Sequence, residues 1–461
     1  MNKNIRIIKN CCGNFIYNVS ENKIFEITKD ELSSFQKYIE KDKIDEIIEK
    51  KYMEKGYLKT TFINEINHPY THLSKYYLDS CIESVVLQVT ESCNFKCRYC
   101  NYSGDGTYDR KHSTKSMKWE IAKESIDFLV EHSENSKSVC LAFYGGEPLL
   151  YFNLIKKSID YIKKIAGYKE IVYRITTNGS LLNEKIIKYF LENKVLLTIS
   201  LDGPKHINDK NRRLVSNGNG TYELIFSKIK LIYDSYPEYL QYLDINAVWD
   251  NEESYEEICD FFNDNEILKN IPCSITQVSS DRINTYYAPD EEQVMNFNRF
   301  LAKCILCKLR ICKENITSID KMLNSFNLIK KNFENNNIMN NSFHHNGPCI
   351  PGQRKLFVSV NGDFYPCEKT TENSSTCKIG TIKDGFYEEK IKLLMNIGKL
   401  TEDDCKTCYA KHTCVICPAM IETGNGLSLS IKKKLCNDIR KNFKEMIKDY
   451  IILNKIGYYD I

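Results

Sequence analysis

The amino-acid sequence predicts an α/β protein, in which a partial (β/α)6 barrel lies between an N-terminal α+β unit and a cysteine-rich C-terminal unit. Strand and helix patterns alternate six times between residues 84 and 278. Such alternation predicts a parallel sheet, because crossover helices cover its faces. The second observation is the use of cysteine. Ten of the 20 cysteines fall into three spaced sets, which are Cys93/Cys97/Cys100, Cys349/Cys367 and Cys405/Cys408/Cys414/Cys417/Cys436.

Composition excludes several classes of protein. The chain has 461 residues, 42% of them hydrophobic and 27% charged, which is enough for a sizeable core. Its formal net charge of +3 argues for neither a nucleic acid nor a membrane partner. The start, MNKNIRIIKN, has no apolar segment of a secretory signal, and no run approaches the ~18 apolar residues of a membrane span. We therefore expect a soluble cytoplasmic protein, whose thiols stay reduced.

Residues 1–80 are predicted to form a small recognition unit. GNFIYNVSENKIFEIT (13–28) indicates two strands around a turn at 20–22, and two amphipathic helices follow in 29–41 and 45–58. The second helix should end at Gly56. No catalytic constellation occurs here.

Residues 81–290 are predicted to form the barrel. The expected strands are 84–90, 139–144, 171–176, 195–200, 243–249 and 273–278. In such barrels the chemistry lies at the carboxyl ends of the strands. The loops expected to meet there are CNFKCRYC (93–100), GGEP (145–148), TTNGS (176–180) and SLDGP (200–204).

Residues 291–345 read as a helical bridge that becomes Asn-rich, and residues 346–461 as the cysteine-rich unit. In the bridge, Cys304, Cys307 and Cys312 form a fourth possible cysteine set. Cys304 and Cys307 share one helical face, so we favour core packing there over metal binding. In the last unit, KLFVSVNGDFYPC carries Asn361-Gly362, a strong hairpin turn signal.

The first cysteine set suits an iron–sulfur cluster. Spacings of three and two residues in one loop allow three thiolates to hold three corners of a [4Fe–4S] cluster. A fully ligated cluster takes four cysteines, so one iron would stay open to a substrate. Zinc is the alternative, but structural zinc needs a fourth ligand nearby, and none follows closely.

At these residues the chain resembles the radical S-adenosylmethionine (radical SAM) superfamily, whose signature is C-x3-C-x2-C with an aromatic residue before the last cysteine, here Tyr99. The resemblance spans roughly residues 84–280, and it implies a TIM-like partial barrel in which SAM chelates the open iron. It also implies contacts of Gly145, Gly146 and Glu147 with the SAM amino group. Tyr99 would lie against the adenine, Ser200 near the ribose, and Arg212, chosen over Arg213, at the carboxylate.

The C-terminal cysteines resemble the SPASM extension, which usually carries two auxiliary [4Fe–4S] clusters. Cys349, Gly362 and Cys367 are followed by C-x2-C-x5-C-x2-C and Cys436, although the family usually has three residues where this chain has Val415 and Ile416. Zinc binding is the alternative. The resemblance implies a distal cluster on Cys405, Cys408, Cys414 and Cys436, and a nearer cluster on Cys349, Cys367 and Cys417.

The nearer cluster has an undecided fourth position. Relatives keep an eighth cysteine where this chain has Phe343. His344, His345 or Cys377 could fill the position, or a substrate thiol could take it.

These features imply a function. The resemblance implies a 5′-deoxyadenosyl radical that removes hydrogen from carbon, and an open auxiliary iron would suit a substrate thiolate. We therefore expect a peptide maturase similar to the sactipeptide and ranthipeptide enzymes, which join cysteine sulfur to carbon in a precursor peptide. The N-terminal unit resembles the winged-helix domain that holds a leader peptide, and a flavodoxin or ferredoxin would supply electrons.

Two alternatives stay open. One is formylglycine formation of the anaerobic sulfatase-maturase type, or carbon–carbon crosslinking by a SPASM enzyme. The other is a zinc or iron–sulfur protein that only binds or relays electrons, which would leave GGEP unexplained.

Overall fold

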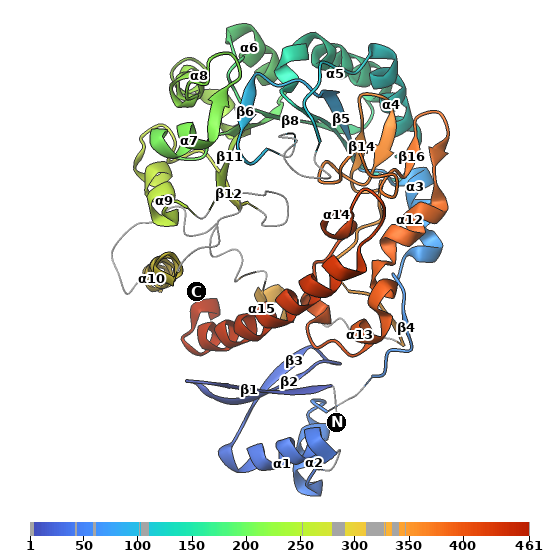
Figure 1. Ribbon diagram of the computed structural model, residues 1–461, viewed down its shortest axis with the longest axis vertical. Helices are drawn as coiled ribbons and strands as arrows, with labels where there is room; N and C mark the ends of the chain where they lie inside the picture. The colour runs from blue at the N-terminus through green and yellow to red at the C-terminus, as the bar shows by residue number, and fades with distance from the viewer. Residues whose placement is uncertain are drawn as a thin grey trace.

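The computed structural model describes residues 4–41, 44–58, 61–100, 102, 110–250, 252–278, 291–309, 327, 329–333, 341–345 and 347–460. Figure 1 shows an elongated molecule, with the barrel at one end, the N-terminal unit at the other and helix α15 between them. No described helix is long and apolar enough to cross a membrane. Of the predicted bridge, the structure describes helix α10 (Glu291–Lys308) and parts of 327–345; Cys312 lies outside the described residues. Cys304 is fully buried in the apolar core.

The N-terminal unit is a three-stranded antiparallel sheet followed by two helices. The sheet order is β1-β2-β3, and Asn22 in the β2–β3 turn has φ +52°, a conformation that Asn tolerates well. The strand pair and both helices match the sequence prediction, whereas the first strand was not predicted. The elements are β1 (Ile5–Asn10), β2 (Gly13–Asn18), β3 (Lys23–Ile27), α1 (Lys29–Lys41) and α2 (Glu46–Glu54).

The two faces of this sheet pack against different parts of the molecule, because successive side chains point to opposite sides. Ile16 and Phe25 face α1 and α2 in a small core, and Leu58 is the last residue along the chain that belongs to it. Phe15 and Tyr17 face helix α15 (Leu429–Lys455) of the C-terminal unit. The expected boundary at residue 80 lies beyond this core.

The segment after that core packs elsewhere. It contains β4 (Glu65–Ile66) and α3 (Ser74–Ser80). Ile66 packs with Phe343 and Cys405, and Leu78 belongs to the barrel core.

The barrel strands are parallel and stand in chain order, as predicted. They are β5 (Ser84–Thr90), β7 (Ser138–Gly145), β8 (Glu170–Thr177), β9 (Leu196–Ser200), β11 (Leu243–Trp249) and β12 (Cys273–Gln277). All seven residues of β5 are buried, as a parallel strand covered on both faces should be. The covering helices are α4 (Trp119–Glu131), α5 (Phe152–Ala166), α6 (Glu184–Glu192), α7 (Lys205–Asn211), α8 (Tyr222–Ser235) and α9 (Tyr255–Asp264).

The cysteine-rich unit continues the barrel sheet. Strand β14 (Leu356–Val358) pairs in parallel with β5, and β15 (Asp363–Tyr365), β16 (Gly380–Thr381) and β17 (Gly385–Phe386) follow in antiparallel pairing. The predicted hairpin turns at Gly362, where φ is +85°. The remaining elements are β13 (Ser342–Phe343), α12 (Glu388–Met395), α13 (Glu402–Lys406) and α14 (Pro418–Ile421).

Candidate functional site

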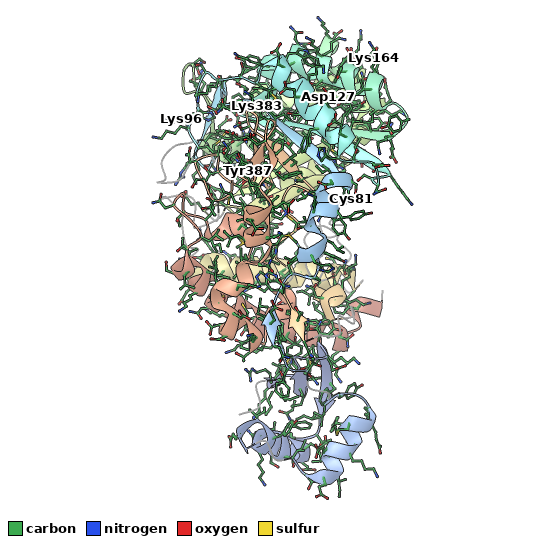
Figure 2. All side chains as sticks on the ribbon, turned by 90° about the vertical axis from the view of Figure 1, so that its right-hand side faces the viewer. Cys81, Lys96, Asp127, Lys164, Lys383 and Tyr387 are labelled. Carbon is green, nitrogen blue, oxygen red and sulfur yellow. The ribbon has the colours of Figure 1, made fainter. Side chains whose placement is uncertain are left out.

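The cysteine loop at the end of β5 contains a short strand that the sequence did not reveal. Strand β6 (Phe95–Cys97) pairs with β10 (Arg212–Leu214), and this register sets Arg212 opposite Cys97. Lys96, the middle residue of β6, is exposed and points away from the molecule (Figure 2). A pairing between residues more than a hundred positions apart therefore brings the expected anion-binding arginine to the cysteine loop.

Backbone and amide N–H groups point at the sulfurs of this loop. The Phe95 amide lies 3.4 Å from Cys93 Sγ, and the Tyr102 amide lies 3.4 Å from Cys100 Sγ. Asn178 Nδ2, from the loop after β8, lies 4.0 Å from Cys93 Sγ. These donors favour thiolates, because hydrogen bonds to a charged group stabilise its charged form.

The two glycines of GGEP allow the second loop to pack on the first. Gly145 has φ +137°, and a Cβ at Gly146 would lie 2.1 Å from the carbonyl oxygen of Ser92. The Gly146 amide donates to the Thr90 carbonyl at 2.7 Å. Glycine is required here because two backbones touch. These glycines therefore hold two loops together, whereas the resemblance implied that they contact the SAM amino group.

Glu147 joins the second and third loops. Its carboxylate is 1% exposed and accepts hydrogen bonds from Thr177 Oγ1 at 2.6 Å and from the amides of Asn178 at 2.7 Å and Leu149 at 2.9 Å. Burial raises the pKa of Glu147, and these hydrogen bonds oppose that rise. The expected ammonium contact would have to use the remaining acceptor capacity of this carboxylate.

The fourth loop meets the first through a buried hydrogen-bond chain. Arg212 Nη1 donates to Tyr99 Oη at 2.9 Å, and Tyr99 Oη donates to Asp202 Oδ2 at 2.5 Å. Arg212 is 5% exposed, and its Nε has no hydrogen-bond partner among the described residues. By contrast, Arg213 is exposed and donates to the Gly218 carbonyl. Ser200 ends β9 on the same rim and is partly buried.

The described residues fit a cluster and its ligand. Burial raises the pKa of the Cys93 thiol to about 12, with Cys97 and Cys100 close enough to add to the rise. Burial likewise raises the pKa of Cys97 to about 12, and the Arg212 charge opposes it. Three gathered thiols and a buried guanidinium nitrogen without a partner are what an iron cluster and an anionic ligand would need.

A second group of cysteines lies beside the barrel sheet, and we call it the nearer site: Cys349, Cys367 and Cys417. Cys349 is exposed as a residue, but partial desolvation of its thiol raises the pKa, and Cys367 and Cys417 raise it further. Burial raises the pKa of the fully buried Cys377 to about 12, Glu422 raises it further, and the thiols of Cys367 and Cys417 add to the rise.

A third group of cysteines lies next to the N-terminal sheet. We call it the distal site: Cys405, Cys408, Cys414 and Cys436. All four line one cavity, together with Phe343 and His345. Burial raises the pKa of Cys414 to about 12, and the other three thiols add to this. Among the described residues, no three Cys, His, Asp or Glu side chains stand as ligands of a single metal ion.

The structure also places the side chains considered for the nearer site's fourth position. His344 Nε2 accepts from the Gly398 amide at 3.1 Å, and its Nδ1 donates to the His345 carbonyl at 3.0 Å. Both ring nitrogens are therefore engaged. His345 and Phe343 line the distal cavity. Cys377 is therefore the candidate among these side chains whose pKa Cys367 and Cys417 raise.

Sequence reasoning missed several polar residues of this region. Asp202 stood in the quoted SLDGP motif, and Asn178 in TTNGS, so a search for polar side chains in those loops would have found both. No sequence signal marked the buried ion pair of Arg110 with Glu372. Gln88 of β5 donates to Glu372 Oε1 at 2.6 Å and to Tyr102 Oη at 3.0 Å, so this network ties the cysteine loop to the C-terminal unit.

Comparison with known proteins gives this site a family. Residues 87–262 match the model of the radical SAM superfamily. The cysteine-type anaerobic sulfatase-maturating enzyme of Clostridium novyi is 30% identical over 42% of this chain and 51% of its own length. The radical SAM cyclopropyl synthase TigE of Paramaledivibacter caminithermalis is 26% identical over 50% of this chain and 48% of its own. The chain thus spans about half the length of these curated relatives.

A solved structure shares the fold over a longer span. The structure of native anSMEcpe with bound AdoMet and the Cp18Cys peptide matches with a TM-score of 0.56 and 19% identity, over 80% of this chain and 99% of that one. At this identity the match supports the fold. The match over residues 87–262, and a rim that gathers the three cysteines with GGEP and SLDGP, identify this part of the chain as a radical SAM domain.

Proposed function

We propose that this protein is a peptide maturase that joins a cysteine sulfur to a carbon atom within a precursor peptide. The proposal depends on three sites in a row: the SAM site on the barrel rim, the nearer site beside the barrel sheet and the distal site beneath the N-terminal unit. Cys93, Cys97 and Cys100 would hold the SAM-binding [4Fe–4S] cluster, and the other two sites would hold auxiliary clusters. Cluster and SAM together supply the radical that removes a hydrogen atom from the substrate.

The residues of the rim would bind and orient SAM. Arg212 would receive the carboxylate, because its Nε is buried without a partner and a charge-assisted bond there would be strong. Tyr99 is held by Asp202 and Arg212, which would fix its ring beside the adenine. Ser200 would lie near the ribose. Gly145, Gly146 and Glu147 would keep the loops together and face the amino group.

The observation that carries the thioether proposal is the composition of the nearer site. Three cysteines are expected as ligands there, and one of them, Cys349, is exposed. Both ring nitrogens of His344 form hydrogen bonds, and His345 lines the distal cavity. A substrate thiol can then lose its proton to solvent and take the fourth position as the thiolate, oriented towards the substrate carbon. The radical would take a hydrogen atom from that carbon, the sulfur would form the S–C bond, and the one electron left over would pass to the auxiliary cluster of the nearer site.

The N-terminal unit would recognise the precursor. Its sheet has β1 and β3 at the edges, and an extended leader peptide can add to such an edge as a further strand. The substrate would be a short cysteine-containing peptide with a leader, and a flavodoxin or ferredoxin would supply electrons.

A second candidate function is formylglycine formation, or carbon–carbon crosslinking. It is favoured by the names of the relatives, which include sulfatase-maturating enzymes, and by the position of Cys377 near Cys367 and Cys417. If Cys377 completes the nearer site, no substrate thiolate is needed there.

The test compares Cys377→Ala with Cys349→Ala, using a cysteine-containing precursor peptide that the wild-type protein modifies. We expect Cys377→Ala to keep forming the thioether. Cys349→Ala should still cleave SAM but form no thioether. Mass spectrometry of the peptide and a 5′-deoxyadenosine assay measure the two steps. Loss of modification in Cys377→Ala, or a formylglycine product from the wild type, would favour the second candidate.

A further inference from the structure

Lys432 is buried behind the distal site. It lies in the first turn of α15 and is 1% exposed. Its Nζ donates to Thr401 Oγ1 and lies 3.8 Å from Cys405 Sγ. Among the described residues, no carboxylate forms an ion pair with Lys432.

This position is unfavourable for a cation unless an anion is close. Removing an ammonium group from water costs several kcal/mol when it is unpaired. The amino end of a helix adds a positive partial charge of its own. The fold tolerates both costs if the four cysteines beside Lys432 carry negative charge together.

Thr401 forms a second link to the same sulfur. Its Oγ1 lies 3.3 Å from Cys405 Sγ. Since the hydroxyl accepts from Lys432, its own proton is free to be donated to a thiolate. Cys405 would therefore receive one direct and one relayed hydrogen bond.

Other charged and polar side chains line the same cavity. The cations are Lys411 and Arg440, the carboxylate is Asp404, and His345 is the imidazole. Lys411 is 4% exposed; burial lowers its pKa to about 8, and Cys408 and Cys405 oppose the fall. His345 accepts at Nδ1 from the Gly347 amide at 3.1 Å, which places its proton on Nε2.

We propose that Lys432, with Thr401, is the counter-ion of the distal cluster and raises its reduction potential. The inference depends on the proposed function only in placing a [4Fe–4S] cluster on Cys405, Cys408, Cys414 and Cys436. A cluster with four thiolates is anionic and gains one more negative charge on reduction. A fixed ammonium beside it stabilises the reduced state more than the oxidised state. Lys432 is a positioning residue in this scheme, since it acts through Cys405 and touches no substrate.

The test is a redox titration of the full-length, cluster-loaded protein, followed by electron paramagnetic resonance. The distal signal is the one that Cys405→Ala removes. Lys432→Met removes the charge and keeps the length of the side chain, and Lys432→Arg keeps the charge. Lys433→Met is the matched control, because Lys433 is the next residue of the same helix and is exposed.

We expect Lys432→Met to move the distal midpoint to a more negative potential, and Thr401→Val to move it less in the same direction. Lys432→Arg should stay near the wild type, and Lys433→Met should match it. If Lys432→Met does not load the distal site while Lys432→Arg does, the counter-ion role is also supported. An unchanged midpoint in loaded Lys432→Met overturns the proposal. So does equal loss of the cluster in both variants, or zinc in the distal site.

These readouts do not depend on the peptide product. Failure to form a thioether with a shifted midpoint would reject the proposed function and leave the role of Lys432 intact. Thioether formation with an unshifted midpoint would support the proposed function and reject the role of Lys432.

Discussion

His412 Nε2 lies 2.8 Å from the carbonyl oxygen of Val19, and this hydrogen bond joins the cysteine-rich unit to the N-terminal sheet. His412 is 3% exposed, and it stands between the distal cysteines Cys408 and Cys414. The neighbouring Ala410 packs on Tyr17 in the same core. The loop that carries two distal cysteines is therefore also the surface on which the expected recognition unit rests.

We predict that His412→Ala loosens the N-terminal sheet. The substitution leaves the buried Val19 carbonyl without its donor, which costs about 1–3 kcal/mol. Hydrogen exchange followed by mass spectrometry should show faster exchange in residues 5–27 and little change in the barrel. His72→Ala is the control, because His72 is exposed. Equal exchange in both variants would contradict the role of this contact.

We predict that Gly146→Ala prevents assembly of the SAM-site cluster. The new Cβ would overlap the Ser92 backbone, and overpacking of this kind costs about 1–3 kcal/mol. Because Ser92 precedes Cys93, the strain falls on the cysteine loop.

Iron content and 5′-deoxyadenosine formation measure this effect. The control is Gly218→Ala, where φ is +71° and no atom lies within 4 Å of the added Cβ. It should suffer backbone strain of about 1–2 kcal/mol yet keep the cluster. A fully loaded Gly146→Ala protein would refute the packing argument.

We predict that Arg212→Gln weakens SAM binding and Arg213→Gln does not. Loss of a hydrogen bond to a charged group costs about 1.5–3 kcal/mol, which corresponds to roughly 10- to 150-fold in affinity. Equilibrium dialysis of the anaerobic protein measures the change, and circular dichroism checks the fold. Equal affinities in the two variants would remove Arg212 from the SAM site.

We predict that the N-terminal unit loses stability in acid through Glu31. Burial raises the pKa of Glu31, but hydrogen bonds from Lys51, the Thr28 amide and Tyr52 lower it to about 2 overall. A carboxyl whose pKa is lower in the folded state stabilises above its unfolded pKa of about 4.3. This contribution is lost as pH falls from there towards 2.

Urea unfolding with hydrogen exchange in residues 5–58 measures the difference between wild type and Glu31→Gln. The wild type should be the more stable at pH 6, and the gap should narrow at pH 3. A gap that is independent of pH would show that ionisation of Glu31 contributes nothing.

The sequence predicted the barrel well because local patterns dominate there. Strands β5 and β11 begin and end at the residues predicted, β5 as a fully buried run and β11 with buried and less buried residues in alternation. Helix α1 was predicted to its end residues, since its apolar spacing is clear. Strand β1 was missed although it forms a hairpin with β2, because the turn between them is Cys11-Cys12 and carries no Asn-Gly or Asp-Gly signal.

The sequence by itself determined which residues we propose for the chemistry: the C-x3-C-x2-C set, GGEP and SLDGP, each in a loop after a predicted strand. Only the tertiary structure decided how they meet. It placed Arg212 rather than Arg213 inside the site, through pairing of β10 with β6. It put His345 at the distal cavity and Cys377 near Cys367 and Cys417, and it joined β14 to β5. The physical reason is range. Periodicity and turn chemistry act over a few residues, whereas pairing of distant strands and burial of a lone cation depend on which surfaces the whole chain brings together.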